Sequence, residues 1–467
     1  MRYESTRGGI ARLSFSEAIL MGQGEDGGLL VPEVVPDVRS ELEGWRTLPY
    51  PELAFEIIRR YAPEIPSGEL RRIVSRSYRR FSDPRVVPLR WMGGIGILEL
   101  FHGPTLAFKD IALQFLGNLF EELLATREGE DRVILAATSG DTGSAAIEAL
   151  RGRRGMEIFV LYPHRGIAPL QERQMTTVTD PNVHCLAIEG SFDDCQRIVK
   201  TVFDDLPFKT RHRIGAVNSI NWGRIVAQIV YYFHAWFQAG GEGPVRFSVP
   251  TGNFGDIYAG YLALRMGLPI ERLILATNEN DVLHRFFETG IYRRMPVRRT
   301  IAPAMDIQVA SNLERYLYDR LGRDPARLGA FLTAFAQEGE ARFPLEERPI
   351  DPRFTSVAVG EGAVRATITE WYRRHRYLLD PHSAIGVAAA RRAGDTAPPT
   401  IALATAHPAK FPEVVGAAAG VAPPRHPRLD RLCGLPERKR VLPPDPERVK
   451  KVIEALRDAP PQGGKPV

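Results

Sequence analysis

A lysine inside an apolar stretch is the first residue of this chain whose surroundings suggest chemistry. Lys109 follows Leu106, Ala107 and Phe108 in "HGPTLAFKD", residues 102–110. Most lysines keep the ammonium group in water and lay the side-chain stem along the protein surface. A lysine held among apolar groups loses its proton more easily, and the neutral amine then forms an imine with an aldehyde. Both readings stay open here, and other parts of the sequence must separate them.

Two turns in the sequence combine glycine with the start of a helix-like segment. In "VPTGNFGD", residues 249–256, Gly252 and Gly255 let the backbone approach a ligand where the following helix presents unpaired N–H groups. A second turn, "TSGDTGSAA" at residues 138–146, adds the hydroxyl groups of Ser139, Thr142 and Ser144. Either turn alone is equally well explained as a tight connection between a strand and a helix. Two such turns and a candidate imine lysine together indicate a phosphate-bearing cofactor and a substrate with a carboxylate.

A third cluster of polar residues precedes a long apolar helix-like segment. Its members lie in "NSINWGR" and are Asn218, Ser219, Asn221 and Arg224. A salt bridge within the protein is one explanation for Arg224. The planar guanidinium, two amides and a hydroxyl also supply the charge and the neutral donors that suit a dianionic phosphate. The spacing favours a ligand role.

Residues 22–27, "GQGEDG", match the dinucleotide-binding pattern but lack its setting. That pattern needs a strand before it and a helix after it, whereas here a helix-like segment precedes and the extended "GLLVP" follows. Glu25 and Asp26 would also face the pyrophosphate. We therefore expect no nucleotide at these residues.

The apolar patterns predict the elements that hold these candidates. Residues 1–95 are expected to be mostly helical, because "PELAFEIIRRYA" and "SGELRRIVSRSYRRF" have apolar residues at helical spacing and Ser14 or Ser16 can cap "SEAILMG". Three later segments each pass from β-rich apolar sequence through a turn into helix-like sequence, at 131–150, 156–175 and 245–264. This alternation predicts a doubly wound, parallel α/β sheet.

Two further elements are expected towards the C-terminus. "PTIALATAH", residues 399–407, reads as a buried strand. "DPERVKKVIEAL" places four apolar residues on one helical face, Val449, Val452, Ile453 and Leu456. The last residues, "DAPPQGGKPV", are expected to fray.

Composition excludes several classes of protein. Of 467 residues 44% are hydrophobic, and 61 basic residues against 56 acidic ones leave a net charge of only +5 without a long basic run, so no nucleic-acid partner is expected. Cys185, Cys195 and Cys433 are too few and too far apart for a disulfide framework or a zinc ribbon. No signal-peptide core and no stretch of eighteen apolar residues occurs. We expect a cytoplasmic protein without a membrane partner or a metal site.

The motifs taken together resemble those of the threonine synthases. The resemblance runs from about residue 5 to residue 456 and rests on six segments in the family's order: "SFSEAILMGQGEDGGLLVPE", "LFHGPTLAFKD", "ATSGDTGSAA", "AVNSINWGRI", "VPTGNFGD" and "LATAHPAKF". It implies two doubly wound parallel-sheet domains of the tryptophan-synthase-β-like kind, pyridoxal-phosphate fold type II, after a mostly helical N-terminal segment. The domains expected are residues 1–95, a catalytic region 96–430 with a smaller subdomain at about 126–220 inserted in the larger one, and a C-terminal strand, helix and tail at 431–467.

The resemblance also assigns roles to the candidate residues. Lys109 would hold pyridoxal 5'-phosphate as a Schiff base and shuttle protons, near the start of a helix whose positive end discourages protonation of the amine. The cofactor's phosphate would lie in the loop of Gly252, Asn253, Phe254, Gly255 and Asp256. Thr405 would face the pyridine nitrogen, and Asp141 would lie near the phenolic oxygen, where more distant relatives carry asparagine. The substrate's α-carboxylate is expected at the "TSGDTG" loop and its phosphate at the third cluster; the residues involved are Ser139, Gly140, Thr142, Ser144, Asn218, Ser219, Asn221 and Arg224.

The activity implied is the conversion of O-phospho-L-homoserine and water into L-threonine and phosphate, by elimination followed by hydration. The alternative is a phospho-lyase or amino-acid dehydratase of the same fold, which releases a 2-oxoacid. A non-catalytic relative is disfavoured by the presence of Lys109 and both anion loops, and a nicotinamide dehydrogenase is supported only by the misplaced "GQGEDG". A monomer or a homodimer is expected.

Overall fold

A computed structural model describes residues 1–125, 131–344, 350–394 and 397–457. The chain forms two compact units, the larger from residues 1–120 and 219–429 and the smaller from residues 121–218 with those from 430 onward. Residues 1–95 thus belong to the larger unit, and the C-terminal strand and helix belong to the smaller one. The expected fraying of the last ten residues lies outside the described residues.

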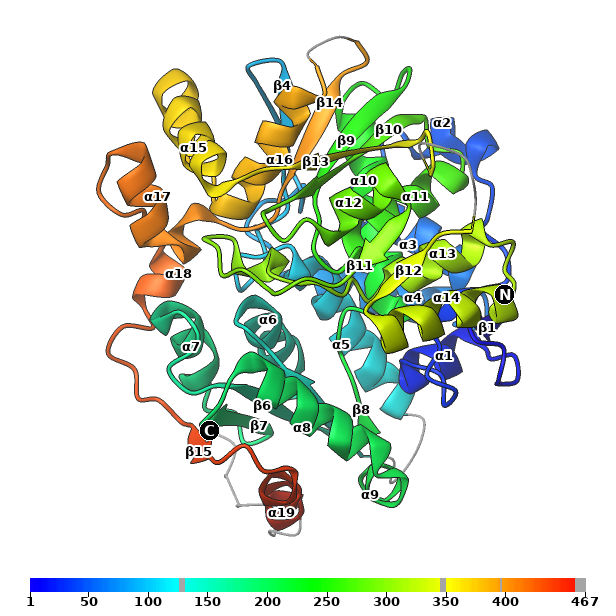
Figure 1. Ribbon diagram of the computed structural model, residues 1–467, viewed down its shortest axis with the longest axis vertical. Coiled ribbons are helices and arrows are strands. Elements are labelled where there is room, and N and C mark those ends of the chain that lie inside the picture. Colours follow the sequence, from blue (N-terminus) through cyan, green and yellow to red (C-terminus); the bar gives the residue numbers. More distant parts are fainter. Residues whose placement is uncertain (126–130, 345–349, 395–396, 458–467) are drawn as a thin grey trace. The chain divides into compact units, whose positions relative to one another are not determined.

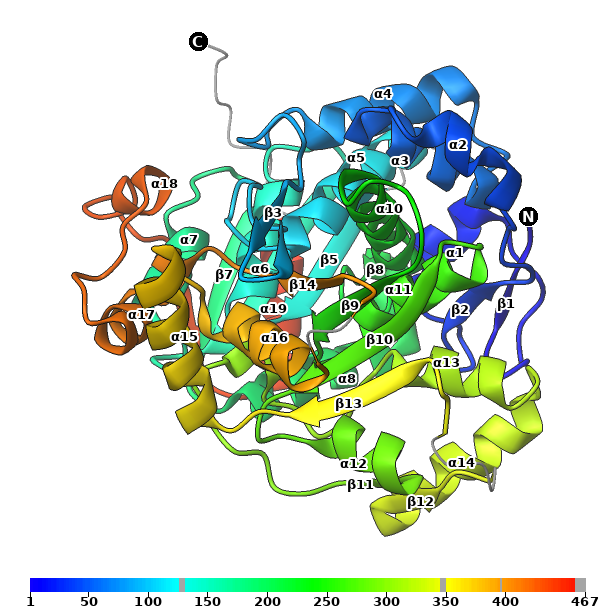
Figure 2. The ribbon, with the colours of Figure 1, turned by 90° about the horizontal axis from the view of Figure 1, so that it is seen from above.

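The larger unit is built on a six-stranded sheet of order β13-β10-β9-β14-β4-β3. Its neighbours pair in parallel except β3 and β4, which are antiparallel, and Figure 2 labels β13, β10, β9, β14 and β3 of this sheet. The strands are β3 (Leu89–Met92), β4 (Ile95–Glu99), β9 (Val245–Pro250), β10 (Ile270–Thr277), β13 (Phe354–Ala358) and β14 (Thr400–Ala404). Because Glu99 pairs with Ala404 and Pro250 with Ala276, the segments that leave β4, β9 and β14 emerge at one edge of the sheet. The three segments carry Lys109, the glycine loop and Thr405.

Helices cover this sheet. Helix α11 packs against β9 and β10, and α16 packs against β9, β10 and β14. The helices of residues 96–120 and 219–430 are α5 (Lys109–Ala125), α10 (Trp222–Gln238), α11 (Gly255–Arg265), α12 (Val282–Thr289), α13 (Leu313–Arg320), α14 (Pro325–Glu338), α15 (Glu361–His375), α16 (Pro381–Arg392), α17 (Pro412–Ala419) and α18 (Pro427–Asp430). A short antiparallel pair, β11 (Ile291–Arg293) and β12 (Glu340–Arg342), joins this region.

The N-terminal segment is mostly helical, as predicted. Its elements are β1 (Tyr3–Ser5), α1 (Phe15–Met21), β2 (Leu30–Pro32), α2 (Leu42–Trp45), α3 (Tyr50–Tyr61) and α4 (Ser67–Tyr78). Ser14, rather than Ser16, caps α1 through a capping box with Glu17. Helix α3 packs against α10, so this segment contributes to the core of the larger unit.

The "GQGEDG" turn connects α1 to β2. The Asp26 carboxylate accepts hydrogen bonds from Ser5 Oγ, Gly9 N and Gly28 N at 2.8–2.9 Å, and so fills the turn itself. A helix before the turn and a strand after it confirm that its setting is the reverse of a dinucleotide-binding loop.

The smaller unit contains a five-stranded, wholly parallel sheet of order β15-β7-β6-β5-β8. Its elements are β5 (Arg132–Ala137), α6 (Asp141–Leu150), β6 (Met156–Pro163), α7 (Pro169–Thr176), β7 (Val183–Ile188), α8 (Phe192–Asp204), α9 (Leu206–His212), β8 (Ile214–Gly215), β15 (Arg440–Leu442) and α19 (Pro446–Arg457), many of which are labelled in Figure 1. Val449 and Ile453 of α19 are fully buried in its core, with Val452 and Leu456 packed beside them. The predicted apolar face of α19 is therefore confirmed.

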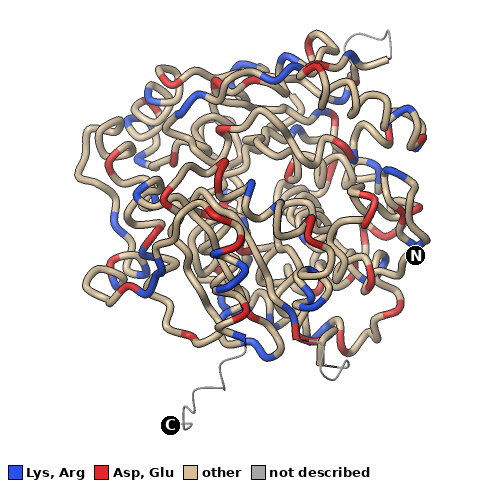
Figure 3. The backbone as a smooth tube through the Cα atoms, turned by 60° about the horizontal axis from the view of Figure 1, so that its bottom comes forward, with Lys and Arg blue, Asp and Glu red and all other residues tan. Residues whose placement is uncertain are grey.

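Charged residues are spread along the whole chain. Figure 3 shows basic and acidic positions interspersed along the described backbone. Among the described residues, none of the helices has the length and apolarity needed to cross a membrane. Cys185 and Cys195 are buried, Cys433 is exposed, and each is a free thiol.

Candidate functional site

Lys109 is the first residue of α5 and is only 9% exposed. The preceding segment is tied to the end of β14, since Phe108 N donates to Thr405 O at 2.8 Å and His407 N donates to Leu106 O at 3.0 Å. The Phe108 ring lies 4.7 Å from Lys109 Nζ. Lys109 is therefore a buried lysine at a helix N-terminus.

Asp110 fixes the turn that presents Lys109. Its two carboxylate oxygens accept hydrogen bonds from Thr105 N and Thr105 Oγ1 at 2.8 and 2.7 Å. Lys410 Nζ donates to Thr105 O at 2.8 Å from the other side. A Cβ atom on Gly103 would lie 2.4 Å from the Asp110 Cβ, so the turn needs glycine there. The sequence analysis missed Asp110 and Lys410, whose only signal was their presence in the "KD" and "HPAKF" segments.

The loop of residues 252–256 has the close-packed geometry of an anion cradle. Phe254 adopts a left-handed conformation with φ of 64°, and its ring packs against Phe287, Tyr316 and Phe354. A Cβ atom on Gly252 would lie 2.9 Å from a backbone oxygen, that of Ala304. The loop leads directly into α11, whose first-turn N–H groups are available to a ligand.

Asp256, the last residue of this loop, is buried in the first turn of α11. The hydroxyl groups of Tyr231 and Tyr232 on α10 both donate to its Oδ1 atom, Tyr232 at 2.9 Å. Burial raises the pKa of Asp256 to about 6, although the two tyrosines and the charge of Lys109 each lower it. The candidate lysine and the candidate phosphate loop are thus electrostatic neighbours within the larger unit.

The predicted phosphate ligands at the start of α10 differ in whether their side chains already have structural hydrogen bonds. Asn221 is fully buried, caps α10 by accepting from Gly223 N at 2.9 Å, and donates to Ile19 O at 3.0 Å. Both ends of its amide therefore have a structural role. These bonds do not support the predicted contact with substrate, which stays a prediction. Arg224 lies one turn further, 4% exposed, and burial lowers its pKa to about 10. Ser219 O accepts from Asn312 Nδ2 at 3.1 Å, while Asn218 is exposed at the end of the smaller unit's first segment.

Thr405 is held at the end of β14 by residues that the sequence analysis did not single out. Its backbone N–H donates to Ser383 Oγ at 3.1 Å, and that hydroxyl donates to Asp380 at the cap of α16. His382 also binds Asp380, through Nδ1 at 2.9 Å, and accepts from Ala304 N at 3.2 Å. The "DPHS" run at 380–383 was the only available signal.

In the smaller unit, the predicted carboxylate loop forms a turn between β5 and α6. Thr138 Oγ1 accepts from Gly140 N and Gly143 N at 3.0 and 2.9 Å, and Gly140 has a φ of 141° that favours glycine. Gln171 Nε2 donates to Asp141 Oδ1 at 2.9 Å. The Ser144 hydroxyl is buried and donates to Asp141 O at 3.1 Å, whereas Ser139 is exposed and Thr142 half-buried.

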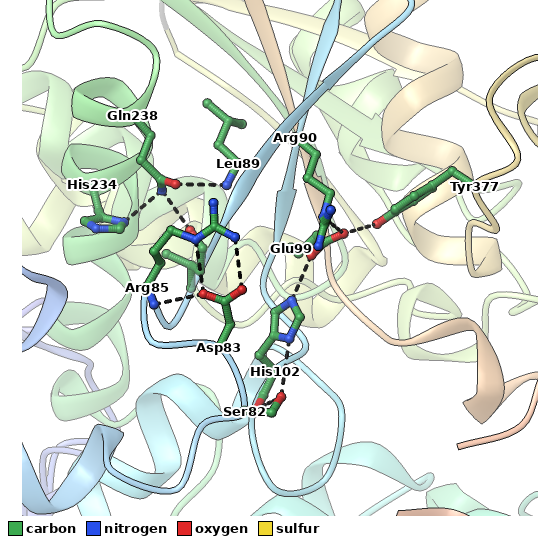
Figure 4. Close-up of polar contacts among 11 residues, drawn as sticks. Ser82, Asp83, Arg85, Leu89, Arg90, Glu99, His102, His234, Gln238 and Tyr377 are labelled. Carbon is green, nitrogen blue, oxygen red and sulfur yellow. Dashed lines mark hydrogen bonds and ion pairs between the residues drawn. The ribbon is translucent and has the colours of Figure 1, made fainter. Parts of the chain in front are cut away.

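A second buried carboxylate lies at the end of β4. Glu99, whose side chain is 4% exposed, receives Arg90 Nε, His102 Nε2 and the Tyr377 hydroxyl, each at 2.8 Å, as Figure 4 shows. Burial alone would raise the pKa of Glu99, but these hydrogen bonds lower it below its usual value. Glu99 lines a cavity of about 760 Å³, yet both of its oxygens are already engaged by the protein.

The chain is similar in sequence to known proteins over most of its length. Family models described as "Threonine synthase N terminus", "Pyridoxal-phosphate dependent enzyme" and "Threonine synthase, C-terminal" match residues 2–78, 97–328 and 383–453. A threonine synthase from Pseudomonas aeruginosa is 49% identical over 451 residues, covering 95% of this chain and 96% of the relative.

Two solved structures are similar over almost the whole chain. The pyridoxal-phosphate-bound threonine synthase from Brucella melitensis superposes with a TM-score of 0.93 at 44% identity, covering 98% of this chain and 100% of the other. A threonine synthase from yeast gives a TM-score of 0.91 at 41% identity, with 98% of each chain covered.

Proposed function

Because this chain belongs to the threonine synthase family, we propose that it converts O-phospho-L-homoserine and water into L-threonine and phosphate. The observation that carries the proposal is the burial of Lys109 at the start of α5, next to Thr405 and within the electrostatic reach of Asp256. We place the reaction in the cytoplasm and expect a monomer or a homodimer.

The residues of the larger unit fit pyridoxal phosphate. Gly252 packs so closely on Ala304 O that the loop needs glycine there, α11 begins at the loop, and the Oδ2 atom of Asp256 is buried without a hydrogen-bond partner among the described residues. Lys109 would hold the cofactor covalently, residues 252–256 its phosphate, and Thr405 would face its ring nitrogen. When bound, pyridoxal phosphate supplies an aldehyde and an electron-withdrawing ring, without which the substrate's Cα proton is not acidic enough to remove.

The protein's own groups then bind, orient and move protons. Lys109 Nζ is the base that we assign to proton transfer at Cα and at Cβ, because a lysine amine is able to accept a proton and return it. Arg224 is assigned to the substrate's phosphate group, which leaves from Cγ before water adds at Cβ. Thr405 offers a neutral hydroxyl rather than a carboxylate, so it does not strongly hold the ring nitrogen protonated.

The smaller unit is assigned the substrate's α-carboxylate. The N–H groups at the start of α6 and the hydroxyls of Ser139 and Thr142 are the donors that we propose. Asp141, oriented by Gln171, is assigned to the cofactor's phenolic oxygen.

Covalent trapping tests the lysine assignment. Borohydride reduction of the protein loaded with pyridoxal phosphate should fix the cofactor on Lys109, as located by mass spectrometry of peptides. Lys109→Ala should lower kcat by about 10²–10⁴-fold, the usual contribution of a general base. An adduct on Lys410, the other buried lysine of this region, would contradict the assignment.

Product analysis tests the activity. Incubation with O-phospho-L-homoserine should release phosphate and L-threonine in equal amounts, measured by chiral amino-acid analysis. A predominance of 2-oxobutyrate over L-threonine would assign the chain to the phospho-lyase alternative.

A further inference from the structure

Asp256 combines deep burial with an incomplete set of hydrogen bonds. It is 7% exposed and lies in the first turn of α11, directly after the glycine loop. Its Oδ1 atom receives two tyrosine hydroxyls, whereas its Oδ2 atom is buried without a hydrogen-bond partner in the part of the chain that the structure describes. A buried carboxylate oxygen without a donor is costly, so Oδ2 requires either a ligand or a proton.

The groups around Asp256 have opposing effects on the pKa of its carboxyl group. Tyr231 and Tyr232 of α10 donate to the carboxylate, and Lys109 of α5 supplies a positive charge. Helix α13 also packs on α11, but its Arg315 and Asp319 act on Tyr258, further along the helix. With burial opposing these favourable interactions, the pKa of Asp256 is about 6 in the chain without a ligand. A small change in the surrounding charge is therefore enough to change its protonation.

The anion that we assign to residues 252–256 provides this change. A phosphate group brings nearly two negative charges to the loop that contains Asp256, and two like charges at one site disfavour ionisation of both. We propose, on the basis of the function proposed above, that Asp256 takes up a proton when the cofactor's phosphate binds and donates it from Oδ2 in a hydrogen bond. Oδ1 cannot carry this proton as easily, because it already accepts from two hydroxyls.

The proposal predicts proton uptake and a particular pH dependence. A neutral acid at position 256 is part of the bound state, so binding weakens as pH rises above the pKa of the free carboxyl. Asp256→Asn keeps the shape and retains an oxygen that accepts from both tyrosines, and its amide donates at all pH values. The variant therefore mimics the protonated acid without needing a proton.

The test is isothermal titration of the cofactor-free full chain with pyridoxal phosphate, in two phosphate-free buffers of different ionisation enthalpy between pH 7 and pH 9. The wild type should take up about one proton more than Asp256→Asn, and the ratio of their dissociation constants should rise about tenfold per pH unit. Glu370→Gln, which alters a surface carboxylate paired with Arg391, should show the same proton uptake as the wild type.

Three results would each contradict either the proposal for Asp256 or the proposed function on which it rests. Equal proton uptake by the wild type and Asp256→Asn, with normal cofactor binding, would refute the proposal alone. A tenfold or greater loss of affinity in Asp256→Asn at pH 8 would show that the ionised carboxylate is required. Absence of pyridoxal phosphate binding to the wild type would refute the proposed function.

A measurement on the wild type alone covers the case in which Asp256→Asn does not fold. Infrared difference spectra on adding pyridoxal phosphate should show a new carboxylic-acid C=O band that shifts in D₂O. A spectrum without such a band would also contradict the proposal.

Discussion

Two buried carboxyl groups of the larger unit, Glu99 and Asp256, have opposite electrostatic character. Glu99 at the end of β4 receives donors on both oxygens, and its pKa is lowered. Asp256 at the start of α11 receives donors on one oxygen, and its pKa is raised to about 6. Burial raises the pKa of both groups, and at Glu99 the hydrogen bonds from His102, Tyr377 and Arg90 outweigh it. A carboxylate with all oxygens engaged holds structure together, whereas one with an unmatched buried oxygen is suited to respond to a ligand.

The largest effect expected from this comparison is a loss of stability in Glu99→Gln. The change removes the charge that Arg90 and Tyr377 surround and turns one acceptor into a donor, which should lower the free energy of unfolding by about 3–5 kcal/mol. Because the folded-state pKa of Glu99 is lowered, its contribution is complete above its unfolded value of 4.5 and is lost as pH falls through the folded value. Urea unfolding at pH 7 and pH 4 measures both effects.

The surface residue Glu370 is a matched control for that experiment. It pairs with Arg391 and Arg374 while about one third exposed, so Glu370→Gln should leave the unfolding free energy nearly unchanged. Similar losses in the two variants would remove the distinction between the Glu99 network and ordinary surface pairs.

The next largest effect is expected on catalysis, from a change at Arg224 in the first turn of α10. Arg224→Lys keeps a positive charge but loses the planar fork. The variant should have a lower kcat/KM for O-phospho-L-homoserine, equivalent to a loss of about 1.5–3 kcal/mol in transition-state stabilisation. Cofactor absorbance should be unchanged, and Arg391→Lys on the surface should leave kcat/KM unaltered. An unchanged kcat/KM in Arg224→Lys would remove this residue from the substrate site.

The smallest effect is expected to have the opposite sign to that of Glu99→Gln. The folded chain holds a proton on Asp256 more tightly than the unfolded chain, whose usual value is 3.8, so stability falls as pH rises from about 4 to about 6. Asp256→Asn removes this penalty and should stabilise the cofactor-free chain by about 1–3 kcal/mol at pH 8 and by less at pH 5. Thermal unfolding at the two pH values decides the sign; destabilisation at pH 8 would mean that the carboxylate stabilises the fold.

The sequence analysis predicted the elements well where local pattern determines them. The βα segments around β5, β6 and β9, the strand at β14 and the apolar face of α19 follow from periodicities of two and of 3.6 residues. The reverse setting of "GQGEDG" was also readable, because a helix and a strand on either side of a turn are local features. The choice of Ser14 over Ser16 as the cap of α1 required the structure, since both are suitable residues.

Partners distant in the chain were not predictable in the same way. Tyr231 and Tyr232 read as part of an apolar helix, and nothing in their spacing indicates that both hydroxyls point at Asp256, about one helix and one strand later. Asn221 looked like a phosphate ligand by type, but the structure uses its amide to cap α10 and to bind Ile19 O. Type and spacing identify groups able to bind an anion, and they do not reveal which groups are already occupied.

The sequence by itself determined the family and the α/β class, and it predicted Lys109 as the imine lysine, because these depend on residue types in local order. Only the tertiary structure decided that Lys109 is buried, that Asp110 and Lys410 hold its turn, and that Glu99 and Asp256 differ in charge behaviour. The physical reason is that a pKa depends on burial and on donors within a few ångströms, and in this fold those donors come from other strands and helices.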